Sequence, residues 1–124
     1  MIGYVTLGTD DLARGAPLYD AIAEELKGKR MMEFDTFIAW TGANNEPGVA
    51  LTKPFNQEAA SIGNGVMVAF QASSPEQVDR IYQIAMDHGA ADEGPPGPRG
   101  EGFYAGYFRD LDGNKLNAFC MTAA

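Results

Sequence analysis

The chain has little cysteine and no long apolar run. Cys120 is the only cysteine among 124 residues, so no intrachain disulfide can form and a disulfide-stapled secreted domain is excluded. Because Cys120 lies in the apolar run 116–121, we expect a buried, unreactive thiol. No apolar run approaches the ~18 residues of a membrane span, and the N-terminus lacks a basic region followed by an apolar stretch. We therefore expect a cytoplasmic protein that makes no membrane contact.

Basic residues are also scarce. Nine Lys and Arg residues stand against 17 Asp and Glu, which gives a net charge of −8. Phosphate binding needs clustered Lys and Arg, and the basic residues here are scattered along the sequence, so nucleic acid is excluded as a partner. The acidity is interpreted as a solubility feature. A weaker alternative is that it attracts cationic ligands.

What remains is an ordinary globular composition, with an internal repeat. A length of 124 residues with 45% apolar residues is enough for one core, so we expect one domain over 1–124. Its halves, about 1–56 and 64–122, each contain a short apolar strand, an amphipathic helix ended by glycine, and alternating strands. Two curved half-sheets of this kind can join and enclose a cavity, which suits binding of a small molecule.

The first half is predicted to begin with a strand over residues 2–8. Asp10 or Asp11 then supplies a helix N-cap. Pro17 would break an interior turn, so regular helix is expected from about Gly15 and an end near Gly28. Strands are predicted over 31–34, 37–42 and 48–53, because alternating apolar residues are divided there by turn residues.

The second half follows a crossover predicted over 54–65. A strand is expected over 66–70, and Ser74 begins a helix as its cap, with Pro75 in the first turn and Gln77 three residues after the cap. Gly89 ends that helix. Residues 95–102 are rich in proline and glycine and are predicted to be a loop. Strands 103–109 and 115–121 then flank a tight turn.

Two motifs resemble the vicinal oxygen chelate superfamily, which contains the glyoxalases, bleomycin-resistance proteins and extradiol dioxygenases. Residues 11–14 with Leu18 and Tyr19 are similar to its first helix, and residues 108–114 are similar to its final hairpin. The resemblance covers nearly the whole chain. It implies an α+β fold in which two βαβββ modules form a curved mixed sheet around a cavity, and it implies a homodimer.

The same resemblance locates the four positions where the family holds a divalent metal. They fall on Tyr4, near Thr52, and on Met67 and Asn117. None of these side chains is an imidazole, carboxylate or thiolate, the donors that such metals need. The only histidine, His88, lies at a helix end and has no second histidine with which to share an ion. We therefore expect neither a metal nor another cofactor.

Period-two alternation, combined with the family pattern, predicts which side chains face the ligand. If Asn117 faces the site, Lys115 and Phe119 share its face, and Tyr107 faces inward with Ala105 beside it. Met67 and Ala69 face inward from the strand that opens the second half. The predicted ligand-binding residues are Tyr4, Thr6, Trp40, Lys53, Met67, Arg99, Tyr107 and Asn117.

Each of these residues also has a structural alternative. Tyr4, Trp40 and Tyr107 could be packed core aromatics, and Arg99 could be a solvated loop residue. As a binding residue, Arg99 or Lys53 would pair with a carboxylate or phosphate of the ligand.

Three functions are compatible with this set, and whether the protein is an enzyme stays open. The first is a metal-free module that binds a small organic molecule. The second is a glyoxalase-like lyase or isomerase acting on a small carbonyl or thiol-conjugate substrate, with Tyr4, Tyr107 or Glu33 as acid or base. The third is a metal enzyme with displaced ligands such as Glu33, Glu101 or Asp110, which is least favoured because a site without histidine needs clustered carboxylates.

Overall fold

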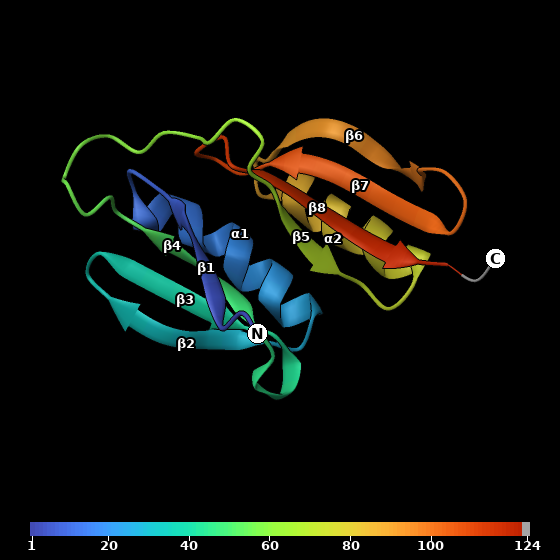
Figure 1. Cartoon of the computed structure of the whole chain (residues 1–124), viewed down its shortest axis with the longest axis horizontal. Coiled ribbons are helices and arrows are strands. Elements are labelled where there is room, and N and C mark those ends of the chain that lie inside the picture. The colour runs from blue at the N-terminus through green and yellow to red at the C-terminus, as the bar shows by residue number, and fades with distance from the viewer. Residues whose placement is uncertain (123–124) are drawn as a thin grey trace. The chain divides into compact units, whose positions relative to one another are not determined.

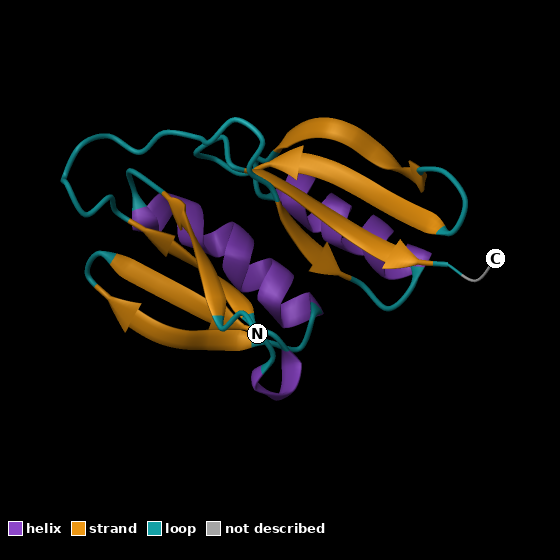
Figure 2. Cartoon of the chain, viewed as in Figure 1, coloured by secondary structure: helices purple, strands orange, loops and turns teal. Residues whose placement is uncertain are grey.

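The computed structural model describes residues 1–122, which form two compact units. The first unit spans Met1–Ile62 and the second begins at Gly63. Each unit has the element order βαβββ, which confirms the α+β class and the two modules (Figures 1 and 2). The strands form two four-stranded mixed sheets, in the orders β1-β4-β3-β2 and β5-β8-β7-β6.

The first unit consists of β1 (Tyr4–Gly8), α1 (Leu12–Glu25), β2 (Lys29–Phe34), β3 (Phe37–Thr41) and β4 (Gly48–Thr52). A short 3-10 turn, Ala43–Asn45, joins β3 to β4. Strand β1 pairs with β4 in parallel, and the other pairs are antiparallel. Helix α1 contacts β2, β3 and β4, and the core between helix and sheet contains Leu18, Tyr19, Ile22, Ile38, Trp40, Val49 and Leu51.

Helix α1 begins earlier than the sequence predicted. The side chain of Asp11 accepts a 3.1 Å hydrogen bond from the backbone N–H of Arg14, so Asp11 is the N-cap. Asp10 instead accepts from the backbone N–H of Ala60 at 2.7 Å. The expected start near Gly15 is wrong, since the helix begins at Leu12 and contains Pro17. The Asp11 cap satisfies the first turn, and apolar burial of the helix outweighs the one N–H that proline removes.

The second unit consists of β5 (Val68–Gln71), α2 (Pro75–Asp87), β6 (Ala91–Pro98), β7 (Phe103–Arg109) and β8 (Lys115–Met121). The predicted start of α2 is confirmed: Ser74 accepts a 3.1 Å hydrogen bond from the N–H of Gln77, and Oε1 of Gln77 accepts one from the N–H of Ser73 at 2.8 Å. Its predicted end is confirmed by Gly89, whose φ is +88°. The buried residues of α2 are Val78, Ile81 and Ala85.

The predicted loop over 95–102 is wrong for its first half. Residues up to Pro98 belong to β6, an edge strand that pairs antiparallel with β7. Two register shifts interrupt this pairing, between Asp92 and Gly94 and between Gly94 and Gly97. An edge strand tolerates prolines because one side of its backbone has no partner strand, so the proline-rich composition did not exclude a strand.

The closing hairpin and the cysteine agree with expectation. Oδ1 of Asp110 accepts hydrogen bonds of 2.9 Å from the N–H groups of Asp112 and Asn114, which shapes the tight turn between β7 and β8. Cys120 is buried, and this burial raises the pKa of its thiol above the ordinary value. Among residues 1–122, neither helix is long and apolar enough to cross a membrane.

Candidate functional site

The C-terminal sheet has one face covered by α2 and one face that α2 does not cover. Tyr82 of α2 contacts Phe108 edge to face, with ring centroids 6.3 Å apart, and Tyr104 donates a 2.7 Å hydrogen bond to Asp79 of α2. Even-numbered residues of β7 therefore face the helix. Tyr107 and the other odd-numbered residues of β7 point to the opposite side, because successive side chains of a strand alternate.

The register extends this second face across the sheet. Tyr107 is the direct cross-strand partner of Asn117, and Asn117 is in turn the partner of Ala69. We call this surface the helix-free face. Its members on the three strands are Ala69, Gln71, Phe103, Ala105, Tyr107, Arg109, Lys115, Asn117, Phe119 and Met121. The register thus confirms that six residues predicted to share a face do so: Ala69, Ala105, Tyr107, Lys115, Asn117 and Phe119. That this face binds a ligand stays a prediction.

Asn117 is the most buried polar residue of this face. It is only 1% exposed, and its Oδ1 has no hydrogen-bond partner among residues 1–122. A buried acceptor left without a donor costs about 1–3 kcal/mol, so the position is unfavourable unless another molecule supplies that donor.

Tyr107 lies beside Asn117 and contacts two cations. The guanidinium carbon of Arg99 and the ammonium nitrogen of Lys115 each lie 5.6 Å from the centroid of its ring. Contacts of this kind are attractive because the ring face carries negative charge density. Three of the predicted ligand-binding residues, Arg99, Tyr107 and Asn117, are therefore brought together on one face, and Lys115 joins them.

Arg99 reaches this position through its own loop. Its Nη2 donates a 2.6 Å hydrogen bond to the carbonyl of Pro95, which turns the side chain back along β6. Cβ atoms placed at Gly94 and Gly97 would lie only 3.2 Å from its two terminal nitrogens. Glycine at both positions is therefore what leaves room for the guanidinium over Tyr107.

The two cations at one end of the helix-free face differ in their partners. Arg109 forms an ion pair with Glu93 and donates a 2.9 Å hydrogen bond to the carbonyl of Gly113. Lys115 is half-buried, and within residues 1–122 the contact of its ammonium is with the ring of Tyr107. At the other end, Phe103 and Phe119 stack with centroids 5.6 Å apart. The face is thus cationic at one end and aromatic at the other.

Met67 contributes less than expected. It precedes the first residue of β5, Val68, and is 40% exposed. The strand predicted over 66–70 begins two residues later, so the sheet does not fix the orientation of this side chain.

The remaining predicted residues lie in the first unit. Tyr4 and Thr6 are exposed on β1, and Tyr4 contacts Phe37 edge to face at 5.9 Å. Lys53 is exposed just after β4, where its backbone N–H donates to the carbonyl of Thr36 at 2.8 Å. Tyr4 and Thr6 share the face of the N-terminal sheet opposite α1, since Val5 and Leu7 alternate with them and Leu7 is buried.

Trp40 faces the other way. It is 2% exposed, and its ring stacks on Tyr19 of α1 with centroids 5.2 Å apart. Its Nε1–H donates a 2.8 Å hydrogen bond to Oδ1 of Asp20. The expectation that Trp40 faces inward with Tyr4 and Thr6 is therefore wrong: it packs between α1 and the sheet, as its structural alternative described.

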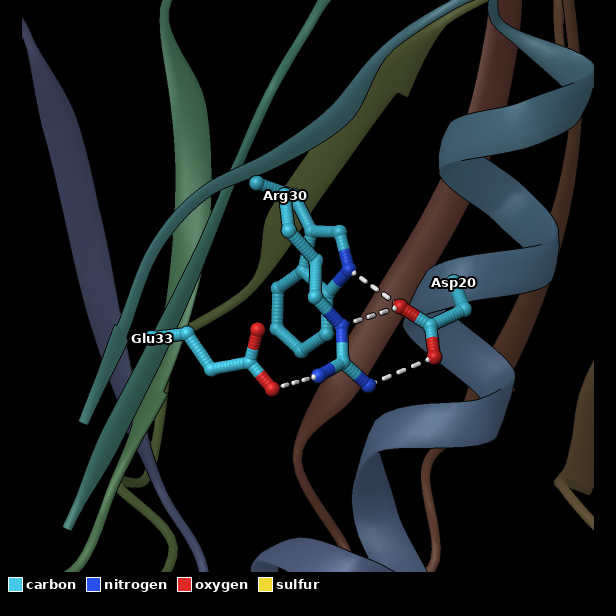
Figure 3. Close-up of polar contacts among 4 residues, drawn as sticks. Asp20, Arg30 and Glu33 are labelled. Carbon is cyan, nitrogen blue, oxygen red and sulfur yellow. Dashed lines mark hydrogen bonds and ion pairs between the residues drawn. The ribbon is translucent and has the colours of Figure 1, made fainter. Parts of the chain in front are cut away.

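Asp20 organises a polar cluster around Trp40. Figure 3 shows Arg30 between the carboxylates of Asp20 and Glu33. Its Nε and Nη2 each lie 2.8 Å from an oxygen of Asp20, and its Nη1 lies 2.6 Å from Oε1 of Glu33. The hydrogen bond from Arg30 is the main reason that the pKa of Asp20 lies below its ordinary value. This cluster, which was not predicted from the sequence, ties α1 to β2 and β3.

The donors at the four family metal positions do not fit a divalent ion. Tyr4, Thr52, Met67 and Asn117 offer a phenol, a hydroxyl, a thioether and an amide, none of which carries a negative charge at neutral pH. Over the described residues 1–122, no three or more His, Cys, Asp or Glu side chains are grouped so that they could hold a metal.

The three carboxylates that the sequence offered as alternative metal ligands either bind other groups of the protein or lie apart in a loop. Glu33 is held by Arg30, Asp110 accepts from the amides of its own turn, and Glu101 is exposed in the loop after β6. His88 is exposed at the end of α2, where its Nδ1 lies 2.8 Å from the carbonyl oxygen of Ile84.

Comparison with known proteins supports the fold and adds relatives. The model of the "Glyoxalase/Bleomycin resistance protein/Dioxygenase superfamily" matches residues 1–118. A glyoxalase/bleomycin resistance protein from Albidiferax ferrireducens T118 is 31% identical, with a TM-score of 0.88 over 97% of this chain and 98% of that one.

More distant structures share the fold. A glyoxalase/bleomycin resistance protein/dioxygenase family enzyme from Burkholderia phytofirmans PsJN is 15% identical, with a TM-score of 0.76 over 96% of this chain and 97% of that one. The fosfomycin resistance protein FosX from Listeria monocytogenes is 19% identical, with a TM-score of 0.72 over 98% of this chain and 93% of that one. A comparison with curated protein sequences gives no match.

Proposed function

Because the chain belongs to the glyoxalase/bleomycin resistance protein/dioxygenase superfamily, we propose that it binds a small organic molecule on the helix-free face of its C-terminal sheet and does so without a divalent metal. The observation that carries this proposal is the buried Oδ1 of Asn117, which lacks a hydrogen-bond partner among residues 1–122. A ligand that donates a hydrogen bond there relieves the cost of the buried acceptor.

The surroundings of Asn117 suit a bound molecule. Ligand sites combine apolar walls with a few fixed polar groups. Phe119 provides apolar surface on this face, and Tyr107 provides both a ring and a hydroxyl. Because Arg99 and Lys115 both contact the Tyr107 ring, that ring is held in place before a ligand arrives.

Binding is better supported than catalysis by a lyase or isomerase. General acid–base chemistry needs a group that exchanges a proton near the substrate. Glu93 lies next to the helix-free face, and its carboxylate is held in an ion pair by Arg109. Glu33, the carboxylate among the acid or base candidates predicted from the sequence, is held by Arg30 on the α1 side of the first unit. Both carboxylates are thus engaged by arginines, which leaves Tyr107 as the candidate acid or base on this face.

The proposal is tested by screening a small-molecule library by thermal shift and then measuring binding to variants. A hit should lose affinity at least about fivefold in Asn117→Ala and in Tyr107→Phe, because each substitution removes one polar contact. Asn56→Ala, which changes an exposed amide of the first unit, is the matched control and should bind as the wild type does. Hits that bind both site variants with unchanged affinity would overturn the proposal.

Metal independence and turnover are separate measurements. Protein purified without added metal should contain less than one equivalent of any divalent ion by elemental analysis, and a chelator should leave ligand affinity unchanged. One tightly bound ion per chain would revive the metal-enzyme alternative. Turnover of a bound compound that disappears in Tyr107→Phe would favour the lyase or isomerase.

The homodimer implied by the family is part of the proposal. Light scattering coupled to size exclusion should give a mass near twice the 13.3 kDa of the chain. If the protein is a monomer and still binds its ligand, the homodimer is overturned and the proposed binding site stands.

A further inference from the structure

We infer that the bound molecule is an organic anion, with its acid group at Lys115 and an apolar body lying toward Phe119 and Phe103. This inference rests on the proposed function, since it names the ligand class of the same face. It is carried by the distribution of charge, the polarity along the strands, and the position of the unpartnered amide oxygen.

The charge of this face is opposite in sign to that of the chain. The whole protein has a net charge of −8 with nine basic residues. Three of those nine, Arg99, Arg109 and Lys115, lie on or over the helix-free face, and the carboxylate paired with them is Glu93. A cationic guest, which the overall acidity weakly suggested, would meet positive charge here.

Lys115 is the cation best placed to bind an anion. The residue is partly buried, and the described contact of its ammonium is with the face of the Tyr107 ring. Arg109 is already neutralised by Glu93, and Asp110 near the same end accepts from the amides of its own turn. A carboxylate or phosphonate would therefore give Lys115 a charge-assisted hydrogen bond in addition to its contact with the Tyr107 ring.

The strands set the length of the ligand. Lys115 and Phe119 lie on the same face of β8 four residues apart, which corresponds to about 13 Å between their Cα atoms. Phe119 stacks on Phe103, which widens the apolar end. The ammonium of Lys115 lies over the ring of Tyr107, the cross-strand partner of Asn117, so the acid group would lie about 7 Å from the level of Phe119. A molecule with one acid group, a short chain and one aromatic ring covers that shorter distance.

Asn117 lies midway between these two ends. Its Oδ1 is an acceptor, so the ligand should carry a hydroxyl or N–H between its acid group and its apolar body. The predicted class is thus an aromatic or branched hydroxy acid or acylamino acid.

Three matched probes test these features by isothermal titration. 3-Phenyllactate has the acid, the hydroxyl and the ring; 3-phenylpropionate lacks the hydroxyl; and 3-phenylpropionamide lacks the charge. We expect affinity to fall in that order, by about 3- to 10-fold at each step, as expected for one hydrogen bond and one charge-assisted contact. The probe 2-phenylethylphosphonate, compared with 3-phenylpropionate, distinguishes a phosphonate from a carboxylate ligand.

Variants assign each feature to its residue. Lys115→Gln should weaken 3-phenylpropionate about tenfold and leave 3-phenylpropionamide unchanged, while Lys115→Arg should retain most of the affinity. Asn117→Ala should make 3-phenyllactate bind no better than 3-phenylpropionate. Lys29→Gln, which changes an exposed lysine of the first unit that is not assigned to the site, is the control for a general loss of positive charge. Circular dichroism and thermal melting check that each variant folds.

The outcomes distinguish a failure of this inference from a failure of the proposed function. If the amide binds as tightly as the acid, if Lys115→Gln weakens both equally, or if no probe binds, the anionic ligand is overturned. Neutral or cationic library hits that depend on Asn117 and Tyr107 would then leave the proposed function standing. Hits whose affinity depends on neither Asn117 nor Tyr107 would overturn both the inference and the proposed function.

Discussion

The indole nitrogen of Trp40 and Nε of Arg30 donate to the same oxygen, Oδ1 of Asp20, each at 2.8 Å. Removal of this carboxylate in Asp20→Ala should lower the free energy of unfolding by about 1–3 kcal/mol, because it leaves the N–H of the buried Trp40 without its acceptor. Chemical denaturation measures the change. Glu24→Ala, an exposed carboxylate on the same helix, should alter stability by less than about 0.5 kcal/mol.

The same carboxylate should make stability depend on pH. The pKa of Asp20 is lower in the folded protein than in the unfolded chain, chiefly through the hydrogen bond from Arg30. Its contribution is therefore complete above about pH 4, the ordinary pKa of aspartate, and is lost as the pH falls through the lower folded value. The difference in stability between wild type and Asp20→Ala should shrink between pH 6 and pH 2, by a modest amount because the side chain is 42% exposed. A constant difference over that range would contradict the prediction.

Gly94 should be required for the position of Arg99. Its φ is +149°, and a Cβ there would lie 3.2 Å from Nη2 of Arg99. We expect Gly94→Ala to lower stability by about 1–2 kcal/mol and to weaken ligand binding, because strain in β6 and the crowded guanidinium disturb the contact with Tyr107. Gly3→Ala is the control, since a Cβ at Gly3 meets no atom within 4 Å. Equal behaviour of the two variants would show that β6 accommodates the methyl group.

His88 should have no functional role. The residue is exposed, and its Nδ1 lies against the carbonyl oxygen of Ile84 in its own helix. His88→Ala should leave ligand affinity and any turnover unchanged, and stability should fall by no more than about 1 kcal/mol through loss of the contact at the helix end. A titration with a library hit measures the affinity, and a large loss would place His88 in the site against this expectation.

Local rules were reliable where a short segment determines its own conformation. The Ser74–Gln77 start and the Gly89 end of α2 depend on neighbouring residues alone, and both were predicted. The rules failed where tertiary contacts override a local preference: Pro17 is carried inside α1 by its cap and its buried face, and the prolines of β6 are tolerated at a sheet edge. In both cases the tertiary setting outweighs the local conformational preference of proline.

The same distinction applies to the candidate site. Alternation along β7 and β8 placed Tyr107 and Asn117 on one face, because each strand is regular and pairs without interruption. The face of Trp40 could not be predicted in this way. Both faces of β3 carry an aromatic residue, so either face could be the buried one. Its orientation is set by Asp20, twenty residues away in the sequence, and a pairing of that range has no local signal.

The composition of β6 also limits how the second unit can associate. Three of its eight residues, Pro95, Pro96 and Pro98, have no backbone N–H, and β6 is the outermost strand of its sheet. A foreign strand approaching that border would find too few donors to build a ladder, so growth of the sheet by strand addition there is blocked. The prolines thereby protect the unit from edge-to-edge aggregation, a benefit unrelated to what the protein binds.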